Sequence, residues 1–400
     1  MAHTFYTYTF GCRVNEAEKV VMDKKLIELG FVWREKNPDF YIINSCAVTG
    51  KAEREVRQHI YQTRKKFPKT NIIVTGCAAT NWKRNKITVA GIDVLVENKD
   101  KQNIPTIIND LVCHSCESRN PSSFSGFQLK GRNDITRDKF LASGRLMVKI
   151  QDGCDRYCSY CIVPLLRGKP KSRTIKEILS DIQDYTTNNP CHPRSNRGSR
   201  INYLDSRFRG NDNSLSHISE IILTAINTEC FGKDTGETLI QLIDSILTKT
   251  TIPKISFGSI HPWSITDKFL SYYQSILPTN RFIPFFHIPI QSGSNTILQL
   301  MNRGYTKEEI LKKLQKIKKI NPNAFIGTDI IVGFPGETDK KFQETYEFLK
   351  TAPIDKIHVF RYSPRPGPAA EKFPNEPTPA EKRERSRELI EMEKQNKNIR

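Results

Sequence analysis

Three cysteines lie close together near the middle of the chain, in the pattern Cys154-x3-Cys158-x2-Cys161. They follow a strand predicted at 146–151, so their three thiolates can face one metal centre. A closed structural zinc site needs four ligands. Three thiolates on a [4Fe–4S] cube leave one iron open to a ligand from a substrate or cofactor, whereas four thiolates occupy every iron. A zinc site completed by a distant residue, or three incidental thiols, is the alternative.

Short apolar runs alternate with helical patterns over residues 1–112. Strands are expected at 5–10, 40–43 and 71–75, and helices at 15–30 and 49–66. Strands separated by helices imply βαβ units and a parallel sheet. We therefore expect a three-layer, parallel-sheet domain at the N-terminus.

A second group of three cysteines belongs to this predicted sheet. Cys12, Cys46 and Cys77 each come at the end of one of its strands. In a parallel sheet all carboxyl ends lie on one edge, where α/β folds bind ligands. The three cysteines can therefore converge on one point. Three buried core cysteines are the alternative.

The alternation of strands and helices continues over residues 140–375. Six βα units in succession predict an open or partial barrel, and a charged, helical tail is expected at 376–400. Two stretches without periodicity, at 113–139 and 190–217, are expected to be a linker with an irregular insert and a second irregular insert. The six strands are expected at 146–151, 220–224, 254–258, 285–290, 325–332 and 356–360.

The chain is strongly basic. Its 62 Lys and Arg residues exceed its 43 Asp and Glu residues, which gives a formal net charge of +19 and a pI near 9.4. Such an excess favours a polyanionic partner, nucleic acid first and an anionic membrane surface second, with ordinary solubility charge as the alternative.

No apolar run reaches the ~18 residues of a membrane span. Residues 1–10 lack a secretory signal pattern, so we expect a cytoplasmic protein without membrane contact.

The x3/x2 cysteine signature after a strand resembles that of the radical S-adenosylmethionine (SAM) superfamily. Further motifs resemble the methylthiotransferases of that superfamily over nearly the whole chain apart from the inserts. These motifs are Phe10-Gly-Cys-Arg-Val-Asn15, Asn44-Ser-Cys-Ala-Val-Thr49, Val74-Thr-Gly-Cys77, Gln151-Asp-Gly-Cys154, Cys161-Ile-Val-Pro164, Arg167-Gly168, Ser172-Arg173, His287-Ile-Pro-Ile-Gln-Ser-Gly293, Met301-Asn-Arg-Gly-Tyr305, Asp329-Ile-Ile-Val-Gly-Phe-Pro-Gly-Glu-Thr338 and Tyr362-Ser-Pro-Arg-Pro-Gly367.

The resemblance implies a partial (β/α)6 radical SAM barrel after the N-terminal domain, and two [4Fe–4S] clusters. One cluster is expected on Cys154, Cys158 and Cys161, where its open iron chelates SAM. The other, auxiliary cluster is expected on the N-terminal trio, where it holds or delivers the inserted sulfur. One SAM is expected to methylate that sulfur, and a second to give the 5′-deoxyadenosyl radical. A low-potential electron donor of the flavodoxin or ferredoxin type and a sulfur source are implied as partners.

Within the family, the motifs look most similar to the branch that acts on N6-threonylcarbamoyladenosine at position 37 of tRNA. We therefore expect a tRNA-modifying enzyme that transfers a methylthio group to C2 of that adenine. The alternatives are the branches that act on isopentenyladenosine in tRNA or on an aspartate of a ribosomal protein, or a non-catalytic iron–sulfur or RNA-binding descendant. No catalytic residue is assigned beyond the cluster ligands.

Three further residues are candidates for cofactor binding. Arg173 can pair with the carboxylate of SAM, because guanidinium and carboxylate match in a bidentate pair. A surface salt bridge is the alternative. Gly333 and Gly336 follow a strand and allow the backbone to approach a nucleoside closely, with an ordinary βα turn as the alternative.

A basic stripe is expected on the helix that follows Cys46. Arg54, Arg57, Tyr61 and Arg64 recur at helical spacing, and basic residues with an aromatic among them suit phosphate contact and base stacking. A solvated helix face is the alternative. We therefore expect tRNA to contact this stripe.

The chain departs from the family pattern in several places. Residues 381–400 give no strand pattern for the small β-barrel (TRAM) with which the family usually ends, so we expect that domain to be missing. His261 stands where the family has an acid, and Ala225 where it prefers glycine. A zinc site that joins Cys113, Cys116, Cys191 and His192 in the inserts is conceivable, and Cys230 is expected to have no role.

Overall fold

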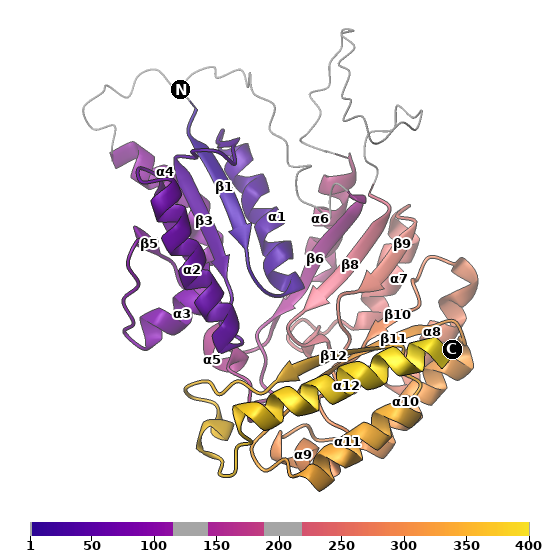
Figure 1. Ribbon diagram of the computed structural model, residues 1–400. Helices are drawn as coiled ribbons and strands as arrows, with labels where there is room; N and C mark the ends of the chain where they lie inside the picture. Colours follow the sequence, from indigo (N-terminus) through magenta and orange to yellow (C-terminus); the bar gives the residue numbers. More distant parts are fainter. Residues whose placement is uncertain (1, 115–142, 188–217, 400) are drawn as a thin grey trace.

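The computed structural model describes residues 2–114, 143–187 and 218–399 (Figure 1). The second insert, 190–217, lies outside these residues, as does the first insert apart from its first two residues. Cys116 and Cys191 are therefore outside the described part of the chain. No helix in that part is long and apolar enough to cross a membrane.

The N-terminal sheet is parallel throughout, with the strand order β2-β1-β3-β4-β5 in the described residues. Its strands are rich in β-branched and aromatic residues, which favour extended backbone. The central strand β3 is buried along its whole length, as expected for a sheet covered on both faces. The strands are β1 (Thr4–Thr9), β2 (Val32–Trp33), β3 (Phe40–Ser45), β4 (Asn71–Gly76) and β5 (Val94–Leu95).

Helices cover both faces of this sheet. Apolar residues of α1 and α4, such as Leu26 and Ile104, share one core with Phe5 and Ile42. Residues of α2 and α3 pack with the alternate side chains of the same strands on the opposite face. The predicted three-layer arrangement is confirmed. The helices are α1 (Arg13–Glu28), α2 (Gly50–Lys66), α3 (Cys77–Arg84) and α4 (Ile104–His114).

Six parallel strands follow in sequence order in the described residues, and a short antiparallel strand, β7, lies at their edge. This is the predicted partial barrel. Hydrogen-bonded ladders join β6-β8-β9 and β10-β11-β12, and a single bridge, Ile255 to Phe282, spans the gap between them. β10 is shorter than predicted because Pro284 and Pro289 flank it and cannot donate to a ladder. The strands are β6 (Arg145–Asp152), β7 (Lys171–Ser172), β8 (Glu220–Ala225), β9 (Lys254–Phe257), β10 (Phe285–His287), β11 (Phe325–Val332) and β12 (Lys356–Arg361).

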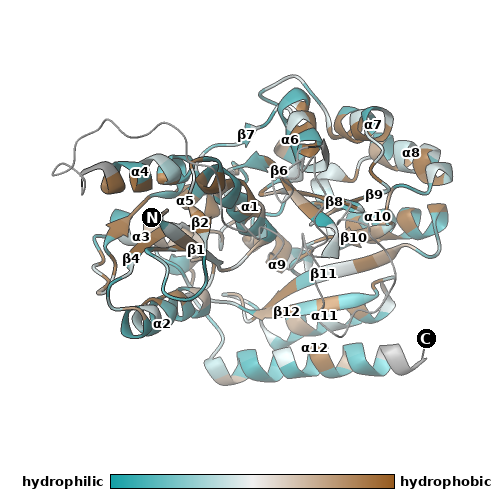
Figure 2. Cartoon of the chain, turned by 90° about the horizontal axis from the view of Figure 1, so that it is seen from above, coloured by the Kyte–Doolittle hydropathy of each residue, from teal (hydrophilic) through white to brown (hydrophobic). Residues whose placement is uncertain are grey.

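Helices cover the outside of these strands, with hydrophobic residues on the strands and hydrophilic residues on the outer helix surfaces (Figure 2). Thr306 and Glu309 form a capping box at the start of α10. The predicted helical tail is α12, which packs against β12, β11 and α11. The helices are α5 (Val163–Arg167), α6 (Ile175–Thr187), α7 (Leu239–Lys249), α8 (Asp267–Ile276), α9 (Asn295–Leu300), α10 (Lys307–Ile320), α11 (Asp339–Thr351) and α12 (Pro379–Ile399).

The two sheets are packed together through α1. Ala17 of α1 is buried against Met147 of β6 and Ile222 of β8. A second contact between the two sheets' domains lies at Glu53 of α2. Its carboxylate accepts hydrogen bonds from Trp82 at 2.5 Å and from the guanidinium of Arg365, which follows β12. Burial alone would raise the pKa of Glu53, but the hydrogen bonds from Arg365 and Trp82 lower it below its ordinary value.

We expect the substitution Arg365→Gln to lower the free energy of unfolding by about 3 kcal/mol, because it leaves a buried carboxylate without its buried cation. The control is Arg57→Gln, which removes a half-exposed cation from the same carboxylate and should cost less than about 1 kcal/mol. Urea unfolding of both variants measures the difference.

The lowered pKa of Glu53 also predicts how the free energy of unfolding depends on pH. Its stabilisation is present above the unfolded pKa of about 4.3 and is lost as the pH falls towards the lower native value. The difference in urea midpoint between the parent protein and Arg365→Gln should therefore shrink below about pH 4. A difference that stays constant or grows on acidification would contradict this account of Glu53.

Candidate metal centres

Cys12, Cys46 and Cys77 lie at three neighbouring strand-to-helix turns of the N-terminal sheet. Cys12 is the N-cap of α1, Cys46 directly follows β3, and Cys77 is the first residue of α3 after β4. The strands are in parallel register, since Asn44 pairs with Thr9 on one side and with Thr75 on the other. Their carboxyl ends therefore lie side by side and bring the three cysteines to one edge.

The thiols of this N-terminal trio are close to one another. A Cβ atom at Gly11 would lie 2.7 Å from the Sγ of Cys46, so the turn before Cys12 needs glycine, whose φ is +88° here. Burial, together with negative charge on Cys77 and Cys12, raises the pKa of Cys46 to about 12. Cys46 and Cys77 are buried while Cys12 is exposed, so the trio can be reached from solvent.

The second trio lies in the loop after β6. Gly153 turns the chain with a φ of +71°, and a Cβ there would lie 2.1 Å from the carbonyl oxygen of Lys169. The amide of Cys154 donates to the carbonyl of Gly168 at 3.1 Å, and the amide of Cys161 donates to the carbonyl of Cys158 at 2.9 Å. Burial, together with negative charge on Cys158 and Cys154, raises the pKa of Cys161 to about 12. The loop thus keeps its three cysteines near one another.

Two side chains from other elements donate to sulfurs of the second trio. Asn227, which follows β8, has its Nδ2 3.6 Å from the Sγ of Cys154. Arg303, which follows α9, has its Nη1 3.3 Å from the Sγ of Cys158. Sequence reasoning missed both roles. Arg303 lies in one of the quoted motifs, and Asn227 comes just after a strand, but neither position indicates a sulfur contact.

A short helix connects the two trios. α5 begins two residues after Cys161, and its Leu166 packs in the same core as Ala78 and Trp82 of α3, the helix that begins at Cys77. The residues after one trio are therefore packed on the residues after the other, and the two groups of cysteines lie in adjacent parts of the molecule.

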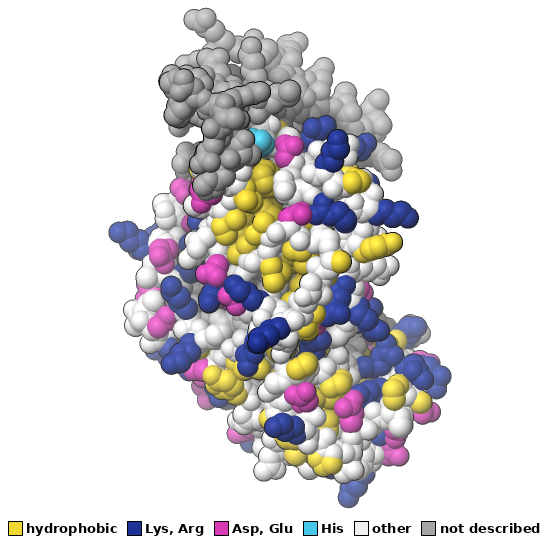
Figure 3. All heavy atoms as spheres, turned by 90° about the vertical axis from the view of Figure 1, so that its left-hand side faces the viewer, with side chains coloured by type: hydrophobic (Ala, Val, Ile, Leu, Met, Phe, Trp, Pro, Cys, Tyr) yellow, Lys and Arg dark blue, Asp and Glu magenta, His cyan; other side chains and the backbone are white. Residues whose placement is uncertain are grey.

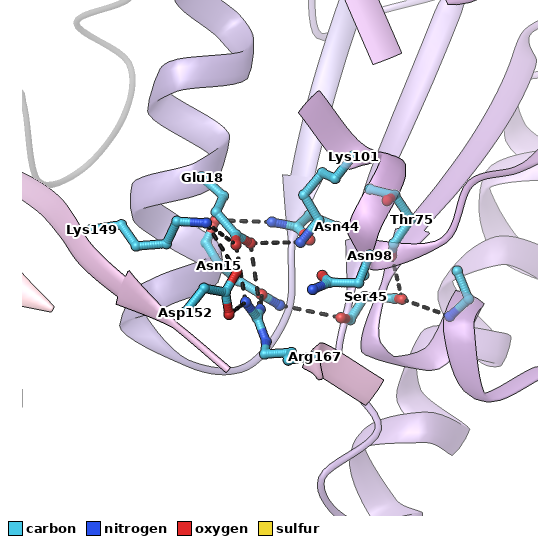
Figure 4. A network of polar contacts seen from close by, with 12 residues as sticks. Asn15, Glu18, Asn44, Ser45, Thr75, Asn98, Lys101, Lys149, Asp152 and Arg167 are labelled. Atoms are coloured by element: carbon cyan, nitrogen blue, oxygen red, sulfur yellow. Dashed lines mark hydrogen bonds and ion pairs between the residues drawn. The ribbon is translucent and has the colours of Figure 1, made fainter. Parts of the chain in front are cut away.

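Arg167, the last residue of α5, extends this connection into a buried polar network (Figure 4). Its guanidinium donates to Glu18 of α1 at 3.0 Å, to Asp152 of β6 at 2.8 Å and to Asn15 at 2.6 Å. Burial alone would lower the pKa of Arg167, but negative charges on Glu18, Cys77, Asp152 and Cys12 raise it. Arg167 therefore lies between the carboxylates and the N-terminal trio.

Lysines neutralise the same network from the other side. Lys101 donates to Glu18 at 2.5 Å and Lys149 at 2.9 Å, and Lys149 also contacts Asp152 at 3.1 Å. Burial alone would raise the pKa of Glu18, but Arg167, Lys101 and Lys149 lower it well below its ordinary value. Glu18 is thus an anion held by three cations, two of which, Lys149 and Arg167, come from the cysteine-bearing half of the barrel.

The donor sets can be compared with what a single metal ion and an iron–sulfur cube require. Within the described residues, no group of three or more His, Cys, Asp and Glu side chains is arranged to hold a metal ion. Each thiolate on a cube binds a different iron, so three sulfurs around a cube need not meet at one point. Each trio offers three thiols, which matches a cube with one open iron. The thiol of Cys230, beside the second trio, donates a hydrogen bond to the carboxylate of Asp155 at 3.3 Å, and its sulfur accepts one from Asn227 at 3.2 Å.

The guanidinium of Arg173 lies in the salt bridge that the sequence left open as the alternative. Its Nη1 is 2.7 Å from Asp181 of α6, and it also contacts the carbonyl oxygens of Lys149 and Glu177. A contact with the carboxylate of SAM stays a prediction, and it requires the bond to Asp181 to be exchanged.

The close neighbour of Gly333 is a helix of the protein. Its φ is +73°, and a Cβ there would lie 2.2 Å from the Cγ of Lys382 in α12. Gly336, with a φ of +84°, faces Leu300. Packing against α12 and α9 explains both glycines, as an ordinary βα turn would, and nucleoside binding there stays a prediction.

The predicted RNA stripe on α2 is only partly free. Arg64 is bound to Asp93 and to the carbonyl oxygens of Pro68 and Thr70, and Arg57 is 2.7 Å from Glu53. Arg54 and Tyr61 are exposed. Lys and Arg side chains are interspersed with Asp and Glu on the face in Figure 3. Arg57 and Arg64 thus have structural roles, because nearby carboxylates and carbonyls satisfy them.

We expect Arg167→Gln to lower the free energy of unfolding by about 3 kcal/mol, because it removes the buried cation shared by Glu18 and Asp152. The control is Arg173→Gln, which breaks a partly exposed ion pair and should cost less than about 1 kcal/mol. Urea unfolding of the metal-free protein measures both. Equal effects of the two substitutions would contradict a special role for the Arg167 network.

Two family models match the chain, one described as "Uncharacterized protein family UPF0004" at residues 4–96 and one as "Radical SAM superfamily" at residues 257–349. The first covers the sheet that carries the N-terminal trio. The second covers β9 to α11, on the carboxyl-terminal side of the second trio. Radical SAM enzymes use SAM and a [4Fe–4S] cluster.

Curated relatives align over almost the whole chain. The threonylcarbamoyladenosine tRNA methylthiotransferase MtaB of Aquifex aeolicus is 31% identical over 96% of this chain and 86% of its own length. The MtaB protein of Bacillus subtilis is 31% identical over 97% of this chain and 80% of its own. The tRNA-2-methylthio-N(6)-dimethylallyladenosine synthase of Petrotoga mobilis is 33% identical over 98% of this chain and 83% of its own.

A solved structure supports the fold. The cobalamin-dependent SAM radical enzyme OxsB, with aqua-cobalamin and SAM bound, superposes with a TM-score of 0.50 at 12% identity, over 98% of this chain and 56% of that protein. Given relatives above 30% identity over nearly the full length, the chain belongs to the radical SAM methylthiotransferase family, the enzyme family that its motifs resemble.

Proposed function

We propose that this enzyme transfers a methylthio group to C2 of N6-threonylcarbamoyladenosine at position 37 of tRNA. The observation that carries the proposal is the pair of cysteine trios joined by α5 and Arg167, because sulfur insertion needs a sulfur carrier beside a radical source. Relatives named for this substrate, from Aquifex aeolicus and Bacillus subtilis, support the choice of substrate.

The chemistry of the target atom explains why two centres are needed. The C2–H bond of adenine is aromatic and not acidic, so a general base near neutral pH cannot open it. A bound cluster and SAM supply radical chemistry, while the protein binds, orients and insulates. In this proposal Cys154, Cys158 and Cys161 hold the SAM-binding cluster, and Cys12, Cys46 and Cys77 hold the auxiliary cluster with the sulfur.

The geometry assigns separate tasks to the surrounding residues. Gly11 and Gly153 provide turns too tight for a side chain, which lets the adjacent cysteines reach their trios. In this proposal the bonds from Arg167 and Lys149 to Glu18, which cross between the two sheets, help to fix the distance between the two sites. The reduction potentials of such clusters lie at about −400 mV or below, so we also propose a flavodoxin- or ferredoxin-type electron donor. A separate sulfur source is proposed as well.

The dimethylallyladenosine-type substrate is the second candidate. The synthase from Petrotoga mobilis, named for that modification, is 33% identical to this chain, slightly more than the MtaB relatives. Both substrates are modified adenines in tRNA, so the two candidates differ in the pocket for the N6 substituent and share the two metal centres.

Iron content after anaerobic reconstitution tests the two centres. We expect about eight irons per chain in the parent protein and about four after triple substitution of either trio by alanine. The Cys12/Cys46/Cys77 variant should still cleave SAM, whereas the Cys154/Cys158/Cys161 variant should not. Cys230→Ala is the matched control and should keep about eight irons, because its thiol is bonded to Asp155 and Asn227. About four irons per chain in the parent protein would contradict the two-cluster proposal.

Nucleoside analysis of tRNA identifies the substrate. We would express the chain in a bacterium without tRNA methylthiotransferases and analyse digested tRNA by mass spectrometry, with Cys158→Ala as the inactive control. The expected product is 2-methylthio-N6-threonylcarbamoyladenosine. Appearance of the 2-methylthio-isopentenyladenosine product instead would favour the second candidate, and absence of both from cells with fully loaded protein would contradict a tRNA function.

A further inference from the structure

Arg303 is a buried guanidinium at the second trio, with 4% of its surface exposed. Its Nε donates to the hydroxyl of Tyr305 at 2.7 Å, and its Nη2 donates to the carbonyl of Pro289 at 2.9 Å. Its Nη1 lies 3.3 Å from both the Sγ of Cys158 and the hydroxyl of Tyr160. The guanidinium also lies 4.4 Å from the ring centre of Trp263. Each of these contacts fixes the cation beside a cysteine sulfur.

None of these partners is a carboxylate. Other buried arginines in the described residues do have one, since Arg167 pairs with Glu18 and Asp152, Arg365 with Glu53, and Arg385 with Glu337 and Asp339. Within the same described ranges, no salt bridge joins Arg303 to an acidic side chain. Arg303 is therefore a buried cation whose neighbours are neutral hydroxyls, a carbonyl, an aromatic ring and a thiol.

A buried charge without a counter-charge is costly, so such a cation indicates a missing anion. The sulfur of Cys158, itself 8% exposed, is the neighbour that can become one. Cys158 must be a thiolate to hold iron. An oxidised cube held by three thiolates carries net negative charge, and an added electron increases that charge. The site thus already contains a cation suited to an anionic, electron-accepting group.

We propose that Arg303 is the counter-charge of the cluster on Cys154, Cys158 and Cys161, and that it makes this cluster easier to reduce. In that step the cluster gains one electron, a low-potential donor of the flavodoxin or ferredoxin type loses one, and no bond or proton changes. The reduced cluster carries more negative charge than the oxidised one, so a fixed cation 3.3 Å from a ligand sulfur stabilises it more. Arg303 is a positioning residue, since it acts through Cys158. The inference rests on the proposed cluster at this trio and not on the identity of the tRNA substrate.

The N-terminal trio differs in this respect. Its nearest guanidinium, Arg167, is already bonded to two carboxylates, so less of its charge is available to a cluster. Asn227, the other donor to the second trio, is neutral and more distant, at 3.6 Å from the Sγ of Cys154. Arg303 is therefore the group that we expect to distinguish the potentials of the two clusters.

The test uses the full chain with Cys12, Cys46 and Cys77 replaced by serine, so that one cluster remains. Into this background we would place Arg303→Gln, Arg303→Lys and a matched control, Arg156→Gln. Arg156 also lies 4.4 Å from the ring of Trp263, but its charge is paired with Glu229, and its contact with the sulfur of Cys154 is made by the backbone, which glutamine keeps. Iron content and electron paramagnetic resonance at poised potentials are measured after reconstitution.

We expect Arg303→Gln to shift the one-electron reduction equilibrium at least tenfold towards the oxidised cluster, which corresponds to about 59 mV. Arg303→Lys keeps the charge and should shift it by less than threefold, as should Arg156→Gln. An unchanged potential in an iron-loaded Arg303→Gln protein would overturn the proposal.

If Arg303→Gln binds no iron, the result for Arg303→Lys distinguishes a counter-charge role from a packing role. Iron binding with a potential within threefold of the parent would support the counter-charge, because charge alone restores the site. A tenfold shift in Arg303→Lys, or failure of that variant to bind iron, would assign Arg303 to packing and overturn the proposal. Absence of iron from the parent with Arg303 intact would instead contradict the proposed cluster itself.

Discussion

The buried ion network around Arg167 is the interaction on which the arrangement of the two sites depends. Arg167 comes from the segment that follows one cysteine trio, and Glu18 lies in the helix that begins at a cysteine of the other. Moving the two sheets apart would break the bonds that Glu18 makes with Arg167 and Lys149, although Glu18 would keep Lys101 and Asp152 would keep Arg167 and Lys149. Separating buried opposite charges is unfavourable, so this network helps to set the spacing of the two cysteine trios, with apolar packing of α5 on α3 as its support.

The buried cations at the two sites differ in whether they are paired with carboxylates. Near the N-terminal trio, three cations (Arg167, Lys101 and Lys149) are interleaved with two carboxylates (Glu18 and Asp152), so each cation already has a carboxylate partner. At the second trio the guanidinium of Arg303 has only hydroxyls, a carbonyl, a ring and Cys158 around it. This contrast fits a division in which one centre carries sulfur and the other accepts electrons, because only the second gains from a cation that the protein leaves unpaired.

Local sequence patterns predicted most of the fold, and long-range pairs decided what they could not predict. Strand and helix periodicity located the turns that carry Cys12, Cys46 and Cys77, since the carboxyl ends of parallel strands share an edge. The pair Arg167–Glu18 joins residues 149 positions apart, and Arg303–Cys158 joins residues 145 apart, so no local pattern reveals either. Gly333 shows the same limit, because the side chain that closely approaches it, that of Lys382, comes from a helix much later in the chain.

The histidine at position 261 completes the electrostatic argument. The motif resemblance leads us to expect an acid there, which would offer a negative charge close to Arg303. In this chain burial lowers the pKa of His261 to about 3, and the charge of Arg303 acts in the same direction, so the ring is neutral near pH 7. It lies parallel to Trp263, with ring centres 6.0 Å apart, and receives a hydrogen bond from the amide of Thr228 at 3.4 Å. A neutral ring here neither cancels the charge of Arg303 nor adds to it, so the cation beside Cys158 stays a single, uncompensated one that a cluster can use.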